Sequence, residues 1–354
     1  MFWIVVIFLF IPFILFSINR DIKQSNSIGL LSLLLLLLIF SFNNGNQDYK
    51  PYLEIFNNPE TYGELGYLLL VNSVKFLGGG HHTIVFLVGV FLTVTFFRLF
   101  TFFKINILIV CILYFIYPFI FDITQIRNTI MFCFVLNGLI EIHKNNFGKS
   151  LLFILIGSFF HNFGIIYFLI AAIYKIYKDS INKIIFVGLF LTLFLPIFFS
   201  FILPEIPILR IQSLVRNYLS GSIKLHSLLI WGVDYFIFII VAFHVRKRIL
   251  LIYQLDKKTR ENIEFLFKIL LIHVIFLGFL MNFFEFNRVY RNAFILRYLF
   301  VGACLPILPS KIQIKLAVYV FINALIFSYL STINLEESYS YEKILTSNRL
   351  LDFF

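Results

Sequence analysis

Residues 121–172 read FDITQIRNTIMFCFVLNGLIEIHKNNFGKSLLFILIGSFFHNFGIIYFLIAA. Long apolar runs dominate this stretch, yet Asp122, Gln125, Arg127 and Asn128 stand at its start and His161 stands deep inside it. An arginine or histidine in hydrocarbon is costly unless it faces protein or water, so such residues are candidates for a functional site. The stretch therefore predicts membrane helices whose polar residues belong to a functional site.

The whole chain has the same character. Of its 354 residues, 60% are hydrophobic and only 13% are charged, and apolar runs of about 18 residues recur along its length. Only helices or a closed barrel span a bilayer, and these runs are continuous rather than alternating, which favours helices. We expect an all-α, polytopic integral membrane helical bundle with about 11–12 transmembrane or half-membrane helices, forming a single domain over residues 1–354.

The net charge of +11 has a simple source in the membrane. The positive residues fall in short loops between apolar runs, where the positive-inside rule and anionic headgroups account for them. We therefore expect membrane lipids, and no nucleic acid, as partners. Cys111, Cys133 and Cys304 lie in apolar runs without paired spacing, which is typical of packing residues and not of a metal site. We expect neither a metal nor another cofactor.

Basic turns orient the bundle. Arg98 and Lys104, then Lys144 and Lys149, and then residues 246–260 mark cytoplasmic turns. The intervening segments then face outside. They are residues 43–82, a polar loop with a re-entrant or interfacial helix; residues 202–226, a basic loop that breaks the charge bias; and residues 331–354, a polar tail.

Residues 150–174 have two interpretations. As one long span they would carry Lys175, Lys178 and Lys183 outside, against the charge rule. Two short crossings, 150–160 and 163–174, keep both basic ends inside, at about 17 Å each. Half-length helices are tolerated where they line a cavity in the protein. In that case His161 lies at the joint and opens outward, whereas a single span with one buried histidine is the alternative.

This topology brings ionisable side chains from distant loops to the outer face. They are Asp48, Glu64, His81, His82, Asp122, Arg127, His161, Arg210, Arg216, Glu285, Arg288 and Arg291. An arginine fork binds two phosphate oxygens at once, so the arginines are candidates for holding a diphosphate. The alternative is ordinary ion pairing of Arg127 with Asp122 and of Arg288 with Glu285.

Three side chains are candidates for acid–base work. His161 titrates near neutral pH when unperturbed, and Glu64 or Asp48 can accept a hydroxyl proton. A hydrogen-bonded histidine at a helix joint and a solvated acidic loop are the alternatives. His81 and His82 follow three glycines and are adjacent, so we expect a solvated turn rather than a metal site. No nucleotide-binding loop, HExxH motif or nucleophile elbow is present.

Four short motifs occur in a recognisable order. They are Asn46-Gln-Asp-Tyr-Lys-Pro-Tyr52, Glu64-Leu-Gly-Tyr-Leu68, Gln125-Ile-Arg-Asn128 and Phe160-His-Asn162. Together they resemble the EpsG family of Wzy-type polysaccharide polymerases over roughly residues 43–174. Leu65 stands where the family often has proline and Asn128 where it often has glutamine, and neither departure removes a charge.

The resemblance implies a GT-C-like membrane glycosyltransferase in the cell inner (cytoplasmic) membrane, with its active site on the periplasmic or extracellular side. Donor and acceptor would be undecaprenyl-diphosphate-linked oligosaccharides, polymerised into O-antigen, capsule or exopolysaccharide, and a chain-length regulator and a flippase are possible partners. Arginines would hold the diphosphate, with Arg127 central. Glu64 or His161 would be the base. The expected substrate-binding residues are Asp48, Tyr49, Tyr52, Asp122, Gln125, Asn128, Arg210, Arg216, Glu285, Arg288 and Arg291.

Two other classes fit the composition. One is another membrane glycosyl or acyl transferase, such as an O-antigen ligase or an O-acetyltransferase. The other is a transporter or flippase of lipid-linked oligosaccharide, which would carry its polar residues at mid-membrane. Apart from His161, the polar residues here gather at the outer ends, which favours an enzyme.

Overall fold

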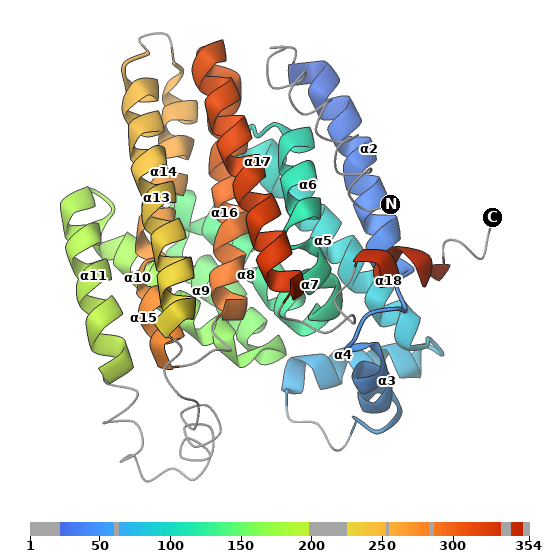
Figure 1. Cartoon of the computed structure of the whole chain (residues 1–354). Helices are drawn as coiled ribbons and strands as arrows, with labels where there is room; N and C mark the ends of the chain where they lie inside the picture. Colours follow the sequence, from blue (N-terminus) through green and yellow to red (C-terminus); the bar gives the residue numbers. More distant parts are fainter. Residues whose placement is uncertain are drawn as a thin grey trace. The chain divides into compact units, whose positions relative to one another are not determined.

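The computed structural model describes residues 22–59, 64–197, 225–252, 255–282, 287–333 and 341–349. Every regular element in these ranges is a helix (Figure 1), and an isolated bridge joins Asn43 to Asn348. The predicted all-α, polytopic membrane protein is confirmed. Four candidate spans are long and apolar enough to cross a membrane: His81–Phe103, Leu229–Leu250, Lys257–Leu280 and Ser310–Ser331. Shorter apolar helices accompany them, at Asn26–Ser41, Leu65–Phe76, Ile107–Ile116, Phe147–Phe160, Asn162–Tyr177 and Ile181–Leu195.

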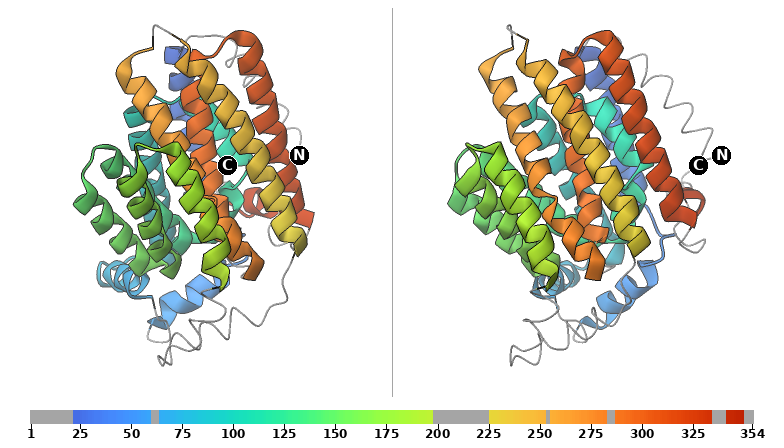
Figure 2. Two further views of the ribbon diagram at one scale, coloured as in Figure 1. Left: turned by 90° about the vertical axis from the view of Figure 1, so that its left-hand side faces the viewer. Right: turned by 60° about the vertical axis from the view of Figure 1, so that its left-hand side comes forward.

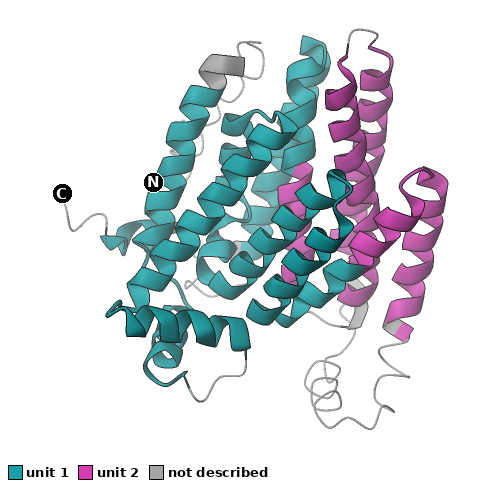
Figure 3. Cartoon of the chain, turned by 180° about the vertical axis from the view of Figure 1, so that it is seen from behind, with its two compact units in different colours: residues 1–168, 298–354 teal, residues 169–297 magenta. Residues whose placement is uncertain are grey.

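The chain divides into two compact units, residues 1–168 with 298–354 and residues 169–297 (Figure 3). The first contains α2 (Ile22–Ser41), α3 (Tyr49–Asn57), α4 (Leu65–Phe76), α5 (His81–Phe103), α6 (Ile107–Ile116), α7 (Phe119–Thr124), α8 (Ile126–His143), α9 (Phe147–Phe160), η2 (Asn162–Ile166), η6 (Leu305–Ile307), α17 (Ser310–Ile333) and α18 (Tyr341–Thr346). The second contains α11 (Ile181–Ile197), α13 (Leu225–Leu250), α14 (Lys257–Ile272) and α15 (Ile275–Asn282), while α10 (Tyr167–Tyr177) and α16 (Asn287–Cys304) cross the boundary. The expectation of a single domain stays a prediction.

Helices α5, α8 and α9 form the centre of the first unit, and α2 packs on both α5 and α6. Glycine permits the closest approach of α2 to α6, since a Cβ on Gly29 would lie 2.6 Å from the backbone nitrogen of Leu108. Helix α17 packs beside α6 (Figure 2). Cys111, Cys133 and Cys304 are buried and unbridged, as the apolar surroundings of each predict.

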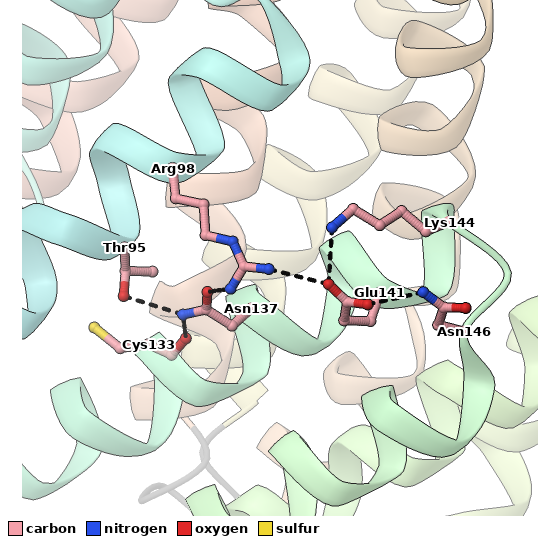
Figure 4. A network of polar contacts seen from close by, with 7 residues as sticks. All are labelled: Thr95, Arg98, Cys133, Asn137, Glu141, Lys144 and Asn146. Carbon is pink, nitrogen blue, oxygen red and sulfur yellow. Dashed lines mark hydrogen bonds and ion pairs between the residues drawn. The ribbon is translucent and has the colours of Figure 1, made fainter.

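Helices α5 and α8 run parallel, and polar side chains join them near their carboxyl ends (Figure 4). Arg98 of α5 donates to Asn137 Oδ1 at 2.5 Å and to Glu141 Oε1 at 3.0 Å on α8. Glu141 also accepts from Lys144 and Asn146, and Asn137 donates to Thr95. One turn of α8 thereby fixes the register of two neighbouring helices.

Helices α8 and α9 form a tight antiparallel hairpin. A Cβ on Gly138 would lie 3.3 Å from the Ser150 carbonyl, and one on Gly157 would lie 3.0 Å from the Met131 carbonyl. Both pairs of residue numbers sum to 288, so the same register sets residue 161 opposite residue 127. The polar start of α8 and the polar end of α9 therefore lie at one level.

The helix ends at Phe160, and the predicted break at His161 is confirmed. His161 adopts extended backbone angles, φ −154° and ψ 125°, before the short helix η2. Gly164 folds back so closely that a Cβ there would lie 2.8 Å from Ser158 Cα. Residues 150–174 therefore do not form one continuous helix, whereas whether they cross the membrane once or as two half-length helices stays a prediction.

The segment predicted as an outer loop contains two short helices. Helix α4 runs across the end of the α5 and α9 helices (Figure 1), and Leu65, Leu69 and Phe76 on it are exposed. Exposed apolar residues on a short helix suit the predicted interfacial or re-entrant position. The described part of the predicted tail returns to this region, because Asn348 Nδ2 donates to Ile39 O at 2.9 Å. Of the predicted basic loop, residues 202–224 lie outside the described residues.

In the second unit, α13 and α11 both pack on α14 and α15. Tyr235 of α13 donates to Leu270 O at 2.8 Å, and Thr192 of α11 donates to Val274 O at 3.0 Å. Arg246 makes two bonds to Glu264, of 2.6 and 3.1 Å, near the other end of α13. These contacts tie the helices of this unit at more than one level.

Candidate functional site

Arg127 lies in the first turn of α8, which is an unfavourable place for a cation. The amino end of a helix carries partial positive charge, so a guanidinium there needs a negative partner. Arg127 Nη1 donates to Glu64 Oε2 at 2.6 Å, and Arg127 Nε donates to the Tyr52 hydroxyl at 3.2 Å. The exposed fractions of the side chains are 21% for Arg127 and 14% for Glu64, so the pair is reachable yet largely shielded from water.

A glycine brings Glu64 to this place. Glu64 directly precedes α4, and Gly66, two residues later, rests on the end of α9. A Cβ on Gly66 would lie 2.9 Å from the backbone carbon and oxygen of Phe159, so a larger residue would push α4 away. The predicted entry motif Glu64-Leu-Gly therefore works through close backbone packing as well as through its charge.

His161 belongs to the same level of the structure. The register of the α8–α9 hairpin sets it opposite Arg127, and α4 packs on Phe159, two residues before it. His161 Nδ1 accepts a bond from the Phe163 backbone N–H at 3.3 Å. Because Nδ1 is the acceptor, the neutral ring carries its proton on Nε2, which makes that nitrogen a donor.

An aromatic group supports the arginine from α3 and α5. The Tyr52 ring lies 5.5 Å from the Arg127 guanidinium carbon and packs against Tyr67. His81 stacks on Tyr52 with an interplanar angle of 17°. Burial raises the pKa of the Tyr52 phenol, an effect that the positive charge of Arg127 partly opposes. Tyr52 therefore stays protonated at neutral pH.

The expectation of a solvated turn at His81 and His82 is wrong for His81. It opens α5 and is only 5% exposed, between rings of Tyr49, Tyr52 and Phe56. His82 Nε2 lies 2.8 Å from the Tyr49 hydroxyl. The rings that bury His81 come from α3, about thirty residues earlier in the chain. The sequence around His81 therefore gave no sign that it would be buried.

Asp48 and Asp122 take different places. Asp48 precedes α3 and lies close enough to Tyr52 for its charge to contribute to the raised pKa of that phenol. Asp122 is buried in α7, where its Oδ2 accepts from the Tyr114 hydroxyl at 2.8 Å and its carbonyl accepts from Thr129 Oγ1. Arg127 pairs with Glu64, a partner that the alternative interpretation did not include.

Gln125 and Asn128 lie on either side of Arg127 in the sequence, and both are buried. Gln125 stands immediately before α8, and its carbonyl accepts the backbone N–H of Thr129. These two residues shape the start of the helix that presents Arg127. Their contact with substrate stays a prediction.

The remaining predicted arginines belong to the second unit or lie outside the described residues. Arg291 is buried and Arg288 is half-buried, both near the start of α16. Arg210, Arg216 and Glu285 fall in residues that the structure does not describe. A shared site of these residues with Arg127 stays a prediction.

A buried ion pair in the second unit was not predicted. Arg297, 1% exposed, donates to Asp234 Oδ2 at 2.5 Å and to the Tyr290 hydroxyl at 2.7 Å. The rings of Phe238 and Phe294 lie 4.9 and 4.4 Å from its guanidinium carbon. Asp234 and Arg297 each stand inside an apolar run of the sequence. Because isolated charges in membrane helices usually pair, this pattern could have predicted the ion pair.

The described contacts around Arg127 suit anion binding combined with proton transfer. The site offers a cation, a carboxylate, a histidine with a donor nitrogen and a buried phenol. Within the described ranges, no three His, Cys, Asp or Glu side chains gather as a metal would require. Such a set can hold a phosphate group and deprotonate a hydroxyl nearby.

Comparison with protein families matches residues 26–343 to the EpsG family. The matched range includes α3, α4, α5, α8 and α9, which together build the site around Arg127. No curated protein and no solved structure gives a significant match. The GT-C-like architecture therefore stays a prediction.

Proposed function

The chain belongs to the EpsG family, and from this premise we propose that it is a glycosyltransferase that polymerises undecaprenyl-diphosphate-linked oligosaccharides. The family indicates a membrane role of the polysaccharide-polymerase type. The product would be O-antigen, capsule or exopolysaccharide. The observation that carries the proposal is the contact of Arg127 with Glu64 and Tyr52, three residues from separate motifs.

The position of the site along α8 supports an outward-facing reaction. Arg127 and Glu141 are 14 residues apart on α8, which corresponds to about 21 Å of helix. The network of Arg98, Glu141 and Lys144 lies at the far end, next to the basic turns that the charge rule assigns to the cytoplasm. The Arg127 end would then face the periplasm or the cell exterior, in the cytoplasmic membrane.

In the proposed reaction, the growing glycan leaves its lipid carrier for a hydroxyl of the next lipid-linked unit. The acceptor hydroxyl gives its proton to a carboxylate oxygen of Glu64 while its oxygen bonds to the anomeric carbon. The bond from that carbon to the diphosphate oxygen breaks, and its electron pair leaves with undecaprenyl diphosphate. Arg127 neutralises the charge on that leaving group.

The hydrogen bond at His161 favours Glu64 over His161 as the base. With Nδ1 accepting from Phe163, the neutral imidazole has its proton on Nε2 and no nitrogen left to accept another. His161 then serves as a donor to an oxygen of the sugar or of the diphosphate. The buried phenol of Tyr52 holds the guanidinium in place through its bond to Nε.

The test is reconstitution of the full chain in proteoliposomes with a lipid-linked repeat unit, with the products separated as a ladder on a gel. We expect Arg127→Ala to slow ladder formation about a hundredfold, the usual cost of losing a group that stabilises transition-state charge. Arg248→Ala, which removes an exposed arginine near the end of α13, is the matched control and should polymerise normally.

Unchanged ladder length and rate with Arg127→Ala would contradict the proposal. The same vesicles separate the alternatives. A flippase would carry the lipid-linked unit across the bilayer without lengthening it, and a ligase or acyltransferase would modify an acceptor once without producing a ladder.

A further inference from the structure

We propose that Glu64 and the donor's diphosphate compete for the guanidinium of Arg127, so that binding of the diphosphate frees the Glu64 carboxylate to take the acceptor's proton. This inference rests on the proposed function and deepens it. It makes Arg127 the link between recognition of the leaving group and activation of the base. Binding of the donor would thus prepare the site for the acceptor.

The first step is the bond itself. Arg127 Nη1 and Glu64 Oε2 are 2.6 Å apart, which is short for a charge-assisted hydrogen bond between partly shielded groups. A carboxylate held by a guanidinium at this distance is a weaker base than a carboxylate free of it. Glu64 therefore needs to leave Arg127 before it can deprotonate a hydroxyl efficiently.

The second step is the exchange of partners. A diphosphate offers several anionic oxygens in the geometry that a guanidinium fork prefers, and it carries more charge than one carboxylate. The amino end of α8, where Arg127 lies, also favours an anion. The diphosphate is thus a stronger ligand for Arg127 than Glu64 is.

The third step concerns the contacts that hold Arg127 and the start of α4 in place when the ion pair opens. Arg127 stays anchored through Nε to Tyr52 and through its position over the Tyr52 ring. Glu64 precedes α4, and its side chain makes no capping bond to that helix. Gly66 keeps the start of α4 seated on Phe159 while the Glu64 side chain changes partner.

The test follows the reactivity of Glu64 in the purified full-length protein. A hydrophobic carbodiimide modifies carboxyl groups that are released from ion pairs, and mass spectrometry measures the modification of Glu64 over time. We expect undecaprenyl diphosphate to raise the labelling rate of Glu64 about fivefold, the factor that about 1 kcal/mol of ion-pair energy corresponds to. Undecaprenol, which has the same chain and no diphosphate, should leave the rate unchanged.

Two variants serve as controls. Arg127→Gln should label rapidly at Glu64 without any lipid and should not respond to undecaprenyl diphosphate. Glu64→Gln should give no adduct at this position. Because the comparison of the two lipids is made on the natural sequence, the result does not depend on either variant folding.

The outcomes separate this inference from the proposed function. A labelling rate that undecaprenyl diphosphate leaves unchanged or lowers, in protein that still builds a glycan ladder, overturns the competition and leaves the polymerase assignment intact. A raised rate in protein that builds no ladder from any lipid-linked unit supports the competition and counts against the polymerase.

Discussion

Tyr52 shows how one side chain can hold a candidate catalytic residue in place. Its hydroxyl accepts from Arg127 Nε and its ring lies against the guanidinium. Tyr52→Phe keeps the ring and removes the hydroxyl, so we expect polymerisation to slow about tenfold, the value of a hydrogen bond to a charged group. Ladder formation in proteoliposomes measures this, and a rate equal to that of the unaltered protein would show that the bond does not matter.

The pH dependence of activity provides a second test of the role of Tyr52. Burial raises the pKa of Tyr52 above its ordinary value of 10.0, so its proton is present throughout the neutral range and is lost only at more alkaline pH than usual. The unaltered protein and Tyr52→Phe should therefore share the same alkaline limit of activity. An alkaline limit that moves in Tyr52→Phe would assign it to this phenol.

The residues of the candidate site also show how much of it could be predicted from the sequence. Arg127 and His161 were predicted because each stands out in an apolar surrounding, and Glu64 because it is a carboxylate in the predicted outer loop. The pairing was not predictable, since Asp122 is five residues from Arg127 and Glu64 is 63 residues away. Glu64 reaches Arg127 from the position just before α4, which the sequence alone does not place beside the start of α8.

At the scale of helices, Glu141 of α8 accepts from three side chains, one of which is Arg98 of α5 (Figure 4). Its bonds to Arg98, Lys144 and Asn146 are lost in Glu141→Ala, while Arg98 and Lys144 are exposed enough to be solvated afterwards. We expect a loss of about 1–2 kcal/mol, seen as an apparent melting midpoint lowered by a few degrees. Lys144→Ala, which removes one arm of the network, should cost less.

Equal melting midpoints for the Glu141→Ala variant and the unaltered protein would show that the bonds of Glu141 add nothing measurable to stability. The sequence did not predict this network. Asn137 and Glu141 are one turn apart on α8, whereas Arg98 reaches them from 39 and 43 residues away. The helix break at His161 was predictable because loop charges on both sides required it.

At the scale of the molecule, the proposed function requires the two ends of α8 to face opposite sides of the membrane. In a chain whose three buried cysteines are replaced, Lys50→Cys before the site and Lys149→Cys beyond α8 report the sides, since both positions are exposed. We expect a membrane-impermeant maleimide added outside intact cells to label position 50 and to spare position 149. Labelling of position 149 alone would invert the topology and remove the outward-facing site.

Composition and apolar runs were enough to predict a helical membrane protein, because lipid demands that backbone groups bond within each helix. The lengths of the helices were harder to predict. Helix α6 has 10 residues and α7 has 6, both buried, so protein rather than lipid surrounds them and the usual length requirement does not apply. Hydropathy indicates whether a segment prefers water or an apolar environment. It does not indicate which helices pack around a given helix.

The buried pair of Asp234 and Arg297 has a consequence for how the protein is made. The two residues are 63 positions apart, and Asp234 is synthesised first. At about 5–20 residues per second, translation needs several seconds to reach the arginine. Asp234 of α13 is therefore synthesised and inserted before its partner Arg297 exists. Helix α13 can take its final position only after α16 has been made.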